Sequence, residues 1–367
     1  MTTARDLQAL LEDGVAVGRF AGAVAVVSEG GRVLSEAAAG DARGEPAAER
    51  TAAGPATLWD LASLTKPLAG TALVLALVED RLLGLDDEIA RFDDLFRREK
   101  FRGVTLRRLL LHTGGLPAWW PLYVRGEGRA AYRRTLADLD LEGPPGRTVV
   151  YSCPGFLILT EIVERVAALP VDRFFRERIA GPLGVADDVL FSPAGDDLGR
   201  AAGGERDDAT ERSLVAGLKL AWSGFRTGVV HGEANDGNAR RRGGVALNAG
   251  LFGTARAVEA LGRAWLDRDR RLLNEASIAD AVRNQTERLA EDRGLGWALA
   301  RTVGSAGPSL PDDAFGHTGF TGSSLFVDPH SRRVYVLLAN RLHPDARSAE
   351  EMIAFRRRFH DVAAALD

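Results

Sequence analysis

Segments with the composition of β-strands lie at both ends of this sequence, and segments with the spacing of helices fill its middle. Residues 21–28 are rich in valine and alanine, a glycine turn follows at Gly30-Gly31, and residues 32–39 form the second strand of a predicted hairpin. Strands that come first and last usually close into one antiparallel sheet, which leaves the middle of the chain as a second lobe. The strand patterns near the C-terminus are residues 294–302, 316–328 and 333–340.

The middle of the chain carries apolar residues at helical spacing, and so do the two termini. The fold class we predict is α+β: an antiparallel sheet flanked by N- and C-terminal helices, with a mostly helical inserted lobe. The predicted sheet lobe comprises residues 1–60 and 286–367, the predicted helical lobe residues 61–285, and the active site lies at their interface. We expect a mobile loop over residues 194–212. The predicted helices are residues 7–15, 68–83, 105–111, 156–168, 170–179, 255–266 and 344–366.

Composition excludes several classes of protein. The net charge of −4 argues against a general nucleic-acid binder. One cysteine, Cys153, permits no intramolecular disulfide and no cysteine-rich zinc site, and six scattered histidines do not make a metal site. Residues 1–14 lack the features of a signal peptide, and the longest apolar run, residues 71–78, is too short for a membrane span. We therefore expect a cytoplasmic protein that binds neither membrane nor nucleic acid and uses no metal or cofactor.

Lysine is rare in this chain, and one lysine has a chemical context. Of 47 basic residues only Lys66, Lys100 and Lys219 are lysines. An amine can lose its proton and a guanidinium effectively cannot, so a lysine in such an arginine-rich chain can mark a position that needs proton transfer. Lys66 follows Ser63 by three residues, which places both side chains on one face of a helix. A serine hydroxyl becomes a good nucleophile when a neighbour takes its proton, and burial favours the neutral amine that could do so.

Two further short patterns carry polar side chains, and each has a structural alternative. The S-x-x-K pattern alone is equally that of a serine near a helix start and a lysine with a buried stem. Tyr151 precedes a predicted helix and is either a base held near cations or a core tyrosine with a satisfied hydroxyl. The sequence His317-Thr318-Gly319 is either a strand edge that binds an extended ligand or an ordinary strand start.

The order of these patterns resembles one known family. The segments 59–66 (WDLASLTK), 109–117 (LLLHTGGLP), 151–153 (YSC) and 317–319 (HTG) follow one another as in the class C β-lactamase and penicillin-binding-protein family of serine hydrolases. That family includes D-alanyl-D-alanine carboxypeptidases and lactamase-like esterases, and the resemblance covers roughly residues 15–345. It implies a β-lactamase/transpeptidase-like fold and a small-molecule ester or amide as substrate.

The resemblance also implies roles for individual residues. Ser63 would attack a carbonyl carbon, while Lys66 and Tyr151 manage its proton. The backbone N–H groups of Ser63 and Phe320 would form the oxyanion hole. His317 would take the place of the lysine of a K-T-G motif. The substrate-binding and oxyanion residues that we expect are Cys153, His317, Thr318, Gly319 and Phe320.

The chain departs from the family pattern at two positions. Cys153 stands where the family often has asparagine, and a thiol is a poor substitute for an amide that grips a substrate amide, which favours esters. Asn248 stands where relatives often have a histidine. The alternative to an enzyme is a binding or sensor protein of the same fold that does not turn over. Esterase, β-lactamase and D,D-peptidase activities all stay open, as does the oligomeric state.

Several other residues are given structural roles. We expect Cys153 to be a small buried thiol rather than a nucleophile, and His112-Thr113-Gly114 to be a structural loop. The arginine runs 240–242 and 356–358 should be solvated faces. Three aromatic residues after the Gly114-Gly115 turn either line the substrate cleft or fill the core between the lobes: Trp119, Trp120 and Tyr123.

Overall fold

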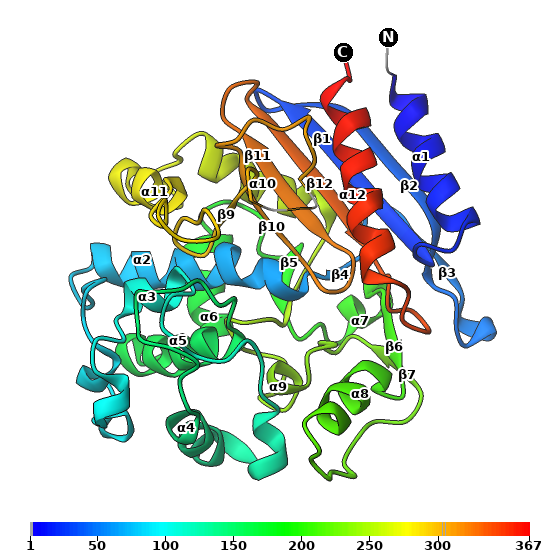
Figure 1. Ribbon diagram of the computed structural model, residues 1–367. Coiled ribbons are helices and arrows are strands. Elements are labelled where there is room, and N and C mark those ends of the chain that lie inside the picture. The colour runs from blue at the N-terminus through cyan, green and yellow to red at the C-terminus, as the bar shows by residue number, and fades with distance from the viewer. Residues whose placement is uncertain (1–2, 303, 305) are drawn as a thin grey trace.

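The computed structural model describes residues 3–302, 304 and 306–367, and its largest element is a seven-stranded antiparallel sheet (Figure 1). The strand order is β3-β2-β1-β12-β11-β10-β9, so β1 pairs with β12 and joins the two ends of the chain. Valine and alanine of β1 face leucine and valine of β12 in this pair, as in Val26 opposite Val336. The strands are β1 (Gly22–Glu29), β2 (Arg32–Arg43), β3 (Thr51–Ala52), β9 (Ala298–Leu299), β10 (Phe315–Thr318), β11 (Ser324–Asp328) and β12 (Arg333–Ala339).

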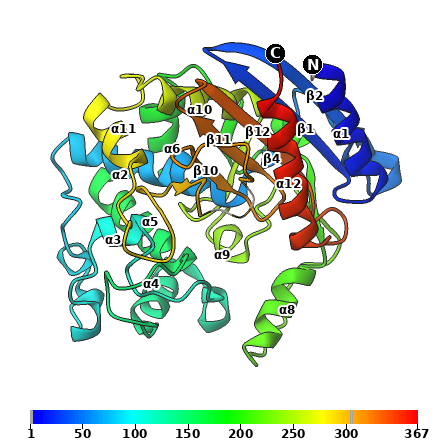
Figure 2. The ribbon, with the colours of Figure 1, turned by 45° about the horizontal axis from the view of Figure 1, so that its top comes forward.

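Helices cover both faces of this sheet. The terminal helices α1 (Ala4–Ala16) and α12 (Ala349–Ala364) lie side by side on one face, where their leucine and phenylalanine side chains pack with Ala23, Ala25 and Val27 of β1 (Figures 1 and 2). The intervening residues of β1 face the other way and pack in the cluster that contains α10 (Ala255–Leu266). The alternation of the strand thus serves two cores, and the predicted α+β fold with flanking terminal helices is confirmed.

Much of the middle of the chain is helical, and its helices α3 to α6, α8 and α9 lie on the other side of α2 (Ala72–Glu79) from the large sheet, whereas α11 lies on the sheet side (Figure 1). Two small sheets accompany the helices, in the orders β4-β8-β5 and β6-β7. The strands are β4 (Trp59–Asp60), β5 (Val189–Phe191), β6 (Gly203–Arg206), β7 (Val229–His231) and β8 (Leu251–Gly253). The helices are α3 (Leu106–Leu110), α4 (Gly128–Asp138), α5 (Cys153–Ala167), α6 (Val171–Phe175), α7 (Asp196–Arg200), α8 (Ala209–Gly217), α9 (Gly237–Arg240) and α11 (Glu275–Val282).

The helical stretch that contains α2 is apolar throughout. By length and composition alone, residues Ala62–Glu79 could cross a membrane, but 83% of this window is buried inside the protein. A Cβ atom on Gly70 within this stretch would lie only 3.0 Å from the ring of Phe156 in α5, so the two helices pack closely there. The surroundings of this stretch are therefore those of a core helix. A buried core helix can be as long and as apolar as a helix that spans a membrane.

Three predicted segments differ from the structure. Of the strand predicted over residues 294–302, only Ala298–Leu299 forms a strand. Residues 316–328 form two strands rather than one, because the chain reverses through Gly319–Ser323 and pairs Thr318 with Ser324. Gly322 has a φ of 110° in this turn, which favours glycine. Residues 194–212 hold α7, β6 and the start of α8 rather than an irregular loop, and the carboxylate of Glu205 accepts hydrogen bonds from Thr210 there.

Candidate active site

Ser63 lies in a 3₁₀ turn, Ala62–Leu64, that is held by a buried carboxylate. Ala62 has a φ of 47°, in the left-handed region that alanine rarely adopts. The Oδ1 atom of Asp60 accepts a hydrogen bond from the Ala62 N–H at 2.8 Å, and its Oδ2 atom accepts two from Asn235, at 2.8 and 2.9 Å. Asp60 thus supports the backbone next to Ser63. Sequence reasoning gave it no role, since one aspartate beside a tryptophan carries no signal of its own.

The chain winds differently after Ser63 than the sequence predicts. The sequence predicts a helix over residues 68–83, just after Pro67, which lacks an N–H to donate. The structure instead has a π-helical turn over Lys66–Thr71, and α2 begins at Ala72. A wider turn is one way for a helix to accommodate a missing hydrogen bond, and such turns are frequent at functional sites.

Lys66 is fully buried with its amine next to Ser63. The Nζ atom lies 3.1 Å from the Ser63 hydroxyl oxygen and 2.8 Å from the Asn248 carbonyl oxygen, and it donates to both. The Cys153 sulfur lies at 3.6 Å and the centroid of the Tyr151 ring at 4.9 Å. The three residues predicted to be catalytic therefore converge, and Cys153 and the Asn248 backbone complete the surroundings of the amine.

The protonation of Lys66 and Tyr151 is coupled. Burial acts to lower the pKa of Lys66, whereas ionised Cys153 and Tyr151 act to raise it, and the net shift of the Lys66 pKa is upward. The prediction that burial favours the neutral amine is therefore wrong for the resting site, because the acidic neighbours outweigh burial. Burial raises the pKa of Tyr151 and outweighs the opposing effect of Lys66. Two groups this close titrate as a pair. The phenol is thus neutral at neutral pH, which argues against a base held ionised by nearby cations, and its hydroxyl has no hydrogen-bond partner among the described residues.

The segment that carries Tyr151 is supported by the His112 loop. The Ser152 N–H donates to Nδ1 of His112 at 2.9 Å, and the rings of His112 and Tyr151 lie 4.6 Å apart. Ser152 also caps α5, because its hydroxyl accepts from the Gly155 N–H at 3.2 Å. Burial holds the pKa of His112 well below its usual value, so the imidazole stays neutral and accepts this bond. The loop has the structural role that its sequence predicts.

The third pattern lies on β10 and approaches the Ser63 turn closely. His317 is buried, its Nδ1–H donates to the Thr318 carbonyl at 2.8 Å, and burial together with Lys66 and Arg293 lowers its pKa to about 3. The imidazole is therefore neutral where a K-T-G lysine would be charged. A Cβ atom on Gly319 would lie 2.7 Å from the Leu61 carbonyl oxygen, so only glycine allows this approach.

Two cavities open beside Ser63, and both are also lined by Tyr151 and Phe320. The first, of about 390 Å³, contains His317, Thr318 and Gly319 and is lined by three arginines, Arg293, Arg341 and Arg356. The second, of about 170 Å³, contains Trp119, Cys153 and three acidic residues, Glu205, Glu211 and Asp236. All predicted site residues except Lys66 thus line one or both cavities, while Lys66 lies buried behind Ser63. No binding role was predicted from the sequence for the arginines that line the first cavity or for the acidic residues that line the second.

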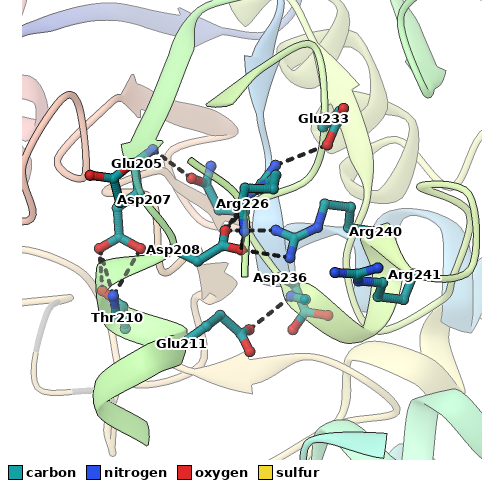
Figure 3. A network of polar contacts seen from close by, with 12 residues as sticks. Glu205, Asp207, Asp208, Thr210, Glu211, Arg226, Glu233, Asp236, Arg240 and Arg241 are labelled. Carbon is teal, nitrogen blue, oxygen red and sulfur yellow. Dashed lines mark hydrogen bonds and ion pairs between the residues drawn. The ribbon is translucent and has the colours of Figure 1, made fainter. Parts of the chain in front are cut away.

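Figure 3 shows the polar network around Glu205, Glu211 and Asp236, the acidic residues that line the second cavity. The Tyr123 hydroxyl donates to Glu211, whose pKa rises to about 7 through burial and the nearby charge of Asp236. Arg240 forms an ion pair with the buried Asp208, at 2.8 Å. Of the predicted aromatic alternatives, Trp119 lines the cavity, whereas Tyr123 belongs to the buried network.

The arginine runs are less solvated than predicted. The guanidiniums of Arg240 and Arg242 are only 8% and 6% exposed and pair with acids, Arg242 with Glu161 and Glu164. Arg356 is buried as well, and its guanidinium donates to backbone carbonyls. Arg residues with carboxylate or carbonyl partners can be buried without leaving polar groups unpaired. The prediction fails for these three residues because charge patterning does not reveal distant partners.

No group of three or more His, Cys, Asp or Glu side chains that could hold a metal ion occurs among the described residues. The chemistry available at this site is that of a hydroxyl, an amine, a phenol and backbone N–H groups.

Comparison with known proteins places the chain among hydrolases. A family model described as Beta-lactamase matches residues 7–356. A protein of Escherichia coli (strain K12), provisionally named a D-alanyl-D-alanine carboxypeptidase, is 30% identical over 314 residues, which cover 78% of this chain and 70% of that protein. A similarly named protein of Salmonella typhimurium (strain LT2) is 27% identical over 315 residues, with the same coverage of both chains.

Solved structures share the fold at lower identity. EstCE1, described as a hydrolase with promiscuous acyltransferase activity, has a TM-score of 0.75 at 22% identity, over 99% of this chain and 98% of its own. A penicillin-binding-protein homologue from Caulobacter crescentus has a TM-score of 0.73 at 21% identity, over 98% and 97% of the two chains. These likenesses establish the architecture around the site.

Proposed function

This chain belongs to the β-lactamase family of serine hydrolases, and we propose that it hydrolyses a small ester or amide through an acyl-enzyme on Ser63. The observation that carries the proposal is the 3.1 Å contact between the Lys66 amine and the Ser63 hydroxyl. A nucleophile and a proton acceptor within hydrogen-bonding distance, the acceptor itself held by a third group, are the minimum for this chemistry. Here the third group is the Asn248 carbonyl, 2.8 Å from the amine.

Acylation would proceed by attack of the Ser63 oxygen on the substrate carbonyl carbon. The Ser63 proton passes to the Lys66–Tyr151 pair after that pair has lost one proton, and the pair then protonates the leaving group. The carbonyl oxygen becomes negative in the tetrahedral intermediate. The backbone N–H groups of Ser63 and Phe320 are the donors we assign to this oxyanion. Deacylation repeats the sequence with water as the nucleophile, which leaves Ser63 and the proton-carrying pair as they began.

Esters are the substrate class that the site favours. Cys153 lines the smaller cavity beside Ser63, at the position where the family often has asparagine. A thiol donates and accepts only weakly, so it offers little to the N–H or C=O of a substrate amide. An ester has no N–H to satisfy and loses less by the replacement. The description of EstCE1 as a hydrolase with acyltransferase activity fits acyl transfer to water from either class, whereas the names of the E. coli and Salmonella relatives favour a D-alanyl peptide.

The same Cys153 observation favours a second candidate. A protein that is acylated at Ser63 but releases the acyl group very slowly would act as a sensor or binder rather than as an enzyme. Acylation alone requires Ser63, Lys66 and the oxyanion donors, all of which this alternative retains.

Hydrolysis of p-nitrophenyl acetate tests the proposal. Nitrocefin and a D-alanyl-D-alanine peptide, assayed in the same way, compare the β-lactam and peptide classes with the ester. Steady release of nitrophenol by the wild type, absent in Ser63→Ala, supports an esterase. A single burst equal to the protein concentration supports the sensor instead. Nitrophenol release that is equal in wild type and Ser63→Ala contradicts both.

A further inference from the structure

We propose that Arg356 is a positioning residue that orients the Gly319–Phe320 peptide and thereby forms one half of the oxyanion hole. This inference rests on the proposed function, because it assumes that the Phe320 N–H is an oxyanion donor. Arg356 comes from α12, the last helix of the chain, and lies far in sequence from Ser63, Lys66 and Tyr151.

The Arg356 guanidinium grips the turn between β10 and β11 at three points. Its Nη2 atom donates to the Gly319 carbonyl at 2.7 Å and to the Ser323 carbonyl at 2.9 Å, and its Nε atom donates to the Gly322 carbonyl at 3.2 Å. The turn adds two hydrogen bonds of its own between Gly319 and residues 322 and 323. Arg356 is only 6% exposed, so few water molecules can replace these contacts. One rigid, planar group therefore sets the shape of the turn.

The Gly319 carbonyl and the Phe320 N–H belong to the same peptide unit. A trans peptide is planar, with its carbonyl and its N–H pointing in opposite directions. When Arg356 holds the carbonyl on the α12 side, the N–H must point away from α12. Phe320 and Ser63 line the same two cavities, and we infer that this direction brings the N–H toward the carbonyl oxygen of a substrate bound at Ser63. A cationic donor on the carbonyl also polarises the peptide and makes its N–H a stronger donor.

Arg341 holds the next peptide in the same way. Its Nη2 and Nε atoms donate to the Phe320 carbonyl at 2.9 and 3.2 Å. Neither Arg341 nor Arg356 forms an ion pair with any acid in the part of the chain that the structure describes. Burial of a guanidinium without an ion pair is costly in free energy, so neutral donors would hold the turn at a lower cost if the role were purely structural.

Three variants of Arg356 and one control separate orientation from stability. Arg356→Lys keeps the charge but loses the planar fork, and Arg356→Ala leaves a space that opens on the larger cavity and can admit guanidinium ion. Arg358→Met is the matched control, because Arg358 lies on the same helix with a side chain that is 63% exposed and donates to Asp13. Arg356→Gln completes the series as a neutral donor of similar length.

We expect a loss of kcat with little change in KM. Loss of one oxyanion donor costs about 10²–10³-fold in kcat, and Arg356→Ala should approach that value while Arg356→Lys loses less. Affinity for phenylboronic acid should fall in parallel, because the Ser63 oxygen, after losing its proton to the Lys66–Tyr151 pair, donates an electron pair to boron and forms a tetrahedral boronate anion with one B–OH group in the oxyanion hole. Guanidinium chloride below denaturing concentrations should restore Arg356→Ala, and ammonium chloride should not. Arg358→Met should behave as wild type.

Hydrogen exchange of the peptide that spans residues 315–325 measures orientation without relying on turnover. Faster exchange in Arg356→Lys than in Arg358→Met supports the inference, even if the wild type proves inactive and the proposed function fails. Wild-type exchange and wild-type kcat in a folded Arg356→Lys or Arg356→Gln overturn it. A fall in kcat that follows the loss of folded protein, with unchanged boronate affinity, overturns it too.

Discussion

The Nζ atom of Lys66 lies 3.1 Å from the Oγ atom of Ser63, and this contact requires a lysine rather than merely a cation. A guanidinium can form a hydrogen bond to a hydroxyl, but it stays protonated at neutral pH and therefore cannot accept the proton of the serine. We therefore expect Lys66→Arg to lower kcat for p-nitrophenyl acetate by about 10²–10⁴-fold, the usual contribution of a general base. Steady-state kinetics measure the effect.

The chain supplies matched controls for this substitution. Lys100→Arg and Lys219→Arg make the same chemical change at positions with no nucleophile nearby. Lys100 donates to the Leu139 carbonyl, which an arginine can also do, and Lys219 follows α8. Both variants should keep wild-type kinetics. Turnover in Lys66→Arg that matches these two controls would refute a proton-transfer role for Lys66.

Replacement of Cys153 should change selectivity without abolishing acylation. The thiol lies 3.6 Å from the Lys66 amine but has a pKa raised by burial, so it is not a ready nucleophile. Cys153→Asn adds an amide that can bind a substrate amide. We expect kcat/KM for nitrocefin, divided by kcat/KM for p-nitrophenyl acetate, to rise by about tenfold. One added hydrogen bond that contributes roughly 1.4 kcal/mol gives a change of this size.

Cys153→Ala is the control for that experiment, because it removes the thiol and adds nothing. Its selectivity ratio should stay near that of the wild type, and Ser63 should still be labelled. An equal shift in the alanine and asparagine variants would show that the added amide is irrelevant. Loss of all labelling in Cys153→Ala would make the thiol itself essential.

The buried imidazole of His317 predicts a loss of stability in acid. An unfolded imidazole takes up a proton below about pH 6.5, whereas the folded one does so only below about pH 3. Between these values the unfolded state binds more protons, so the free energy of unfolding falls as the pH falls, by up to about 1.4 kcal/mol per pH unit. Urea unfolding of wild type and His317→Gln should show this as a wild-type advantage that shrinks from pH 6.5 to 4. A difference that stays constant over that range contradicts the burial of a neutral imidazole.

Asn248 contributes its backbone rather than its side chain. Its carbonyl accepts from Lys66, but neither polar atom of its buried amide has a partner among the described residues. Asn248→Leu should therefore be neutral or stabilising and retain activity, because it removes a buried polar group that makes no hydrogen bond. Asn238 is the contrast: it is equally buried, accepts from the Leu122 N–H and donates to the Trp120 carbonyl.

Thermal and urea unfolding of the two variants make the comparison. We expect Asn238→Leu to cost about 2–4 kcal/mol, because it leaves two buried backbone groups unpaired. Equal destabilisation of Asn248→Leu and Asn238→Leu would mean that the Asn248 amide has a partner after all.

Local patterns in the sequence predicted much of the fold. The β1–β2 hairpin follows from a valine-rich segment and a Gly-Gly turn, and the contact between Ser63 and Lys66 follows from a three-residue spacing on a helix. The ordered motifs then predicted which distant segments would meet. Each of these features depends on residues that are close in sequence or on a pattern shared with relatives.

Features that depend on distant partners escaped prediction. The support of Ala62 by Asp60 and Asn235, the ion pairs of Arg240 and Arg242, and the three carbonyls bound by Arg356 join segments with no local signal. The turn at Phe320 was also missed, because residues 316–328 keep strand composition throughout and only the φ of Gly322 reveals the reversal. The sequence also left the state of Tyr151 open between a base held near cations and a core tyrosine, since only the structure shows that burial of Tyr151 outweighs the effect of one nearby cation.

The most direct test of the central claim is mass spectrometry of the protein after incubation with a fluorophosphonate probe. The probe phosphonylates an activated serine and releases fluoride, so the intact mass should rise by one phosphonyl group, and digestion should place that group on the peptide containing Ser63. Ser63→Ala should show no adduct and Lys66→Arg a greatly slowed one. An unmodified wild-type protein, or an adduct on any residue other than Ser63, would contradict the account.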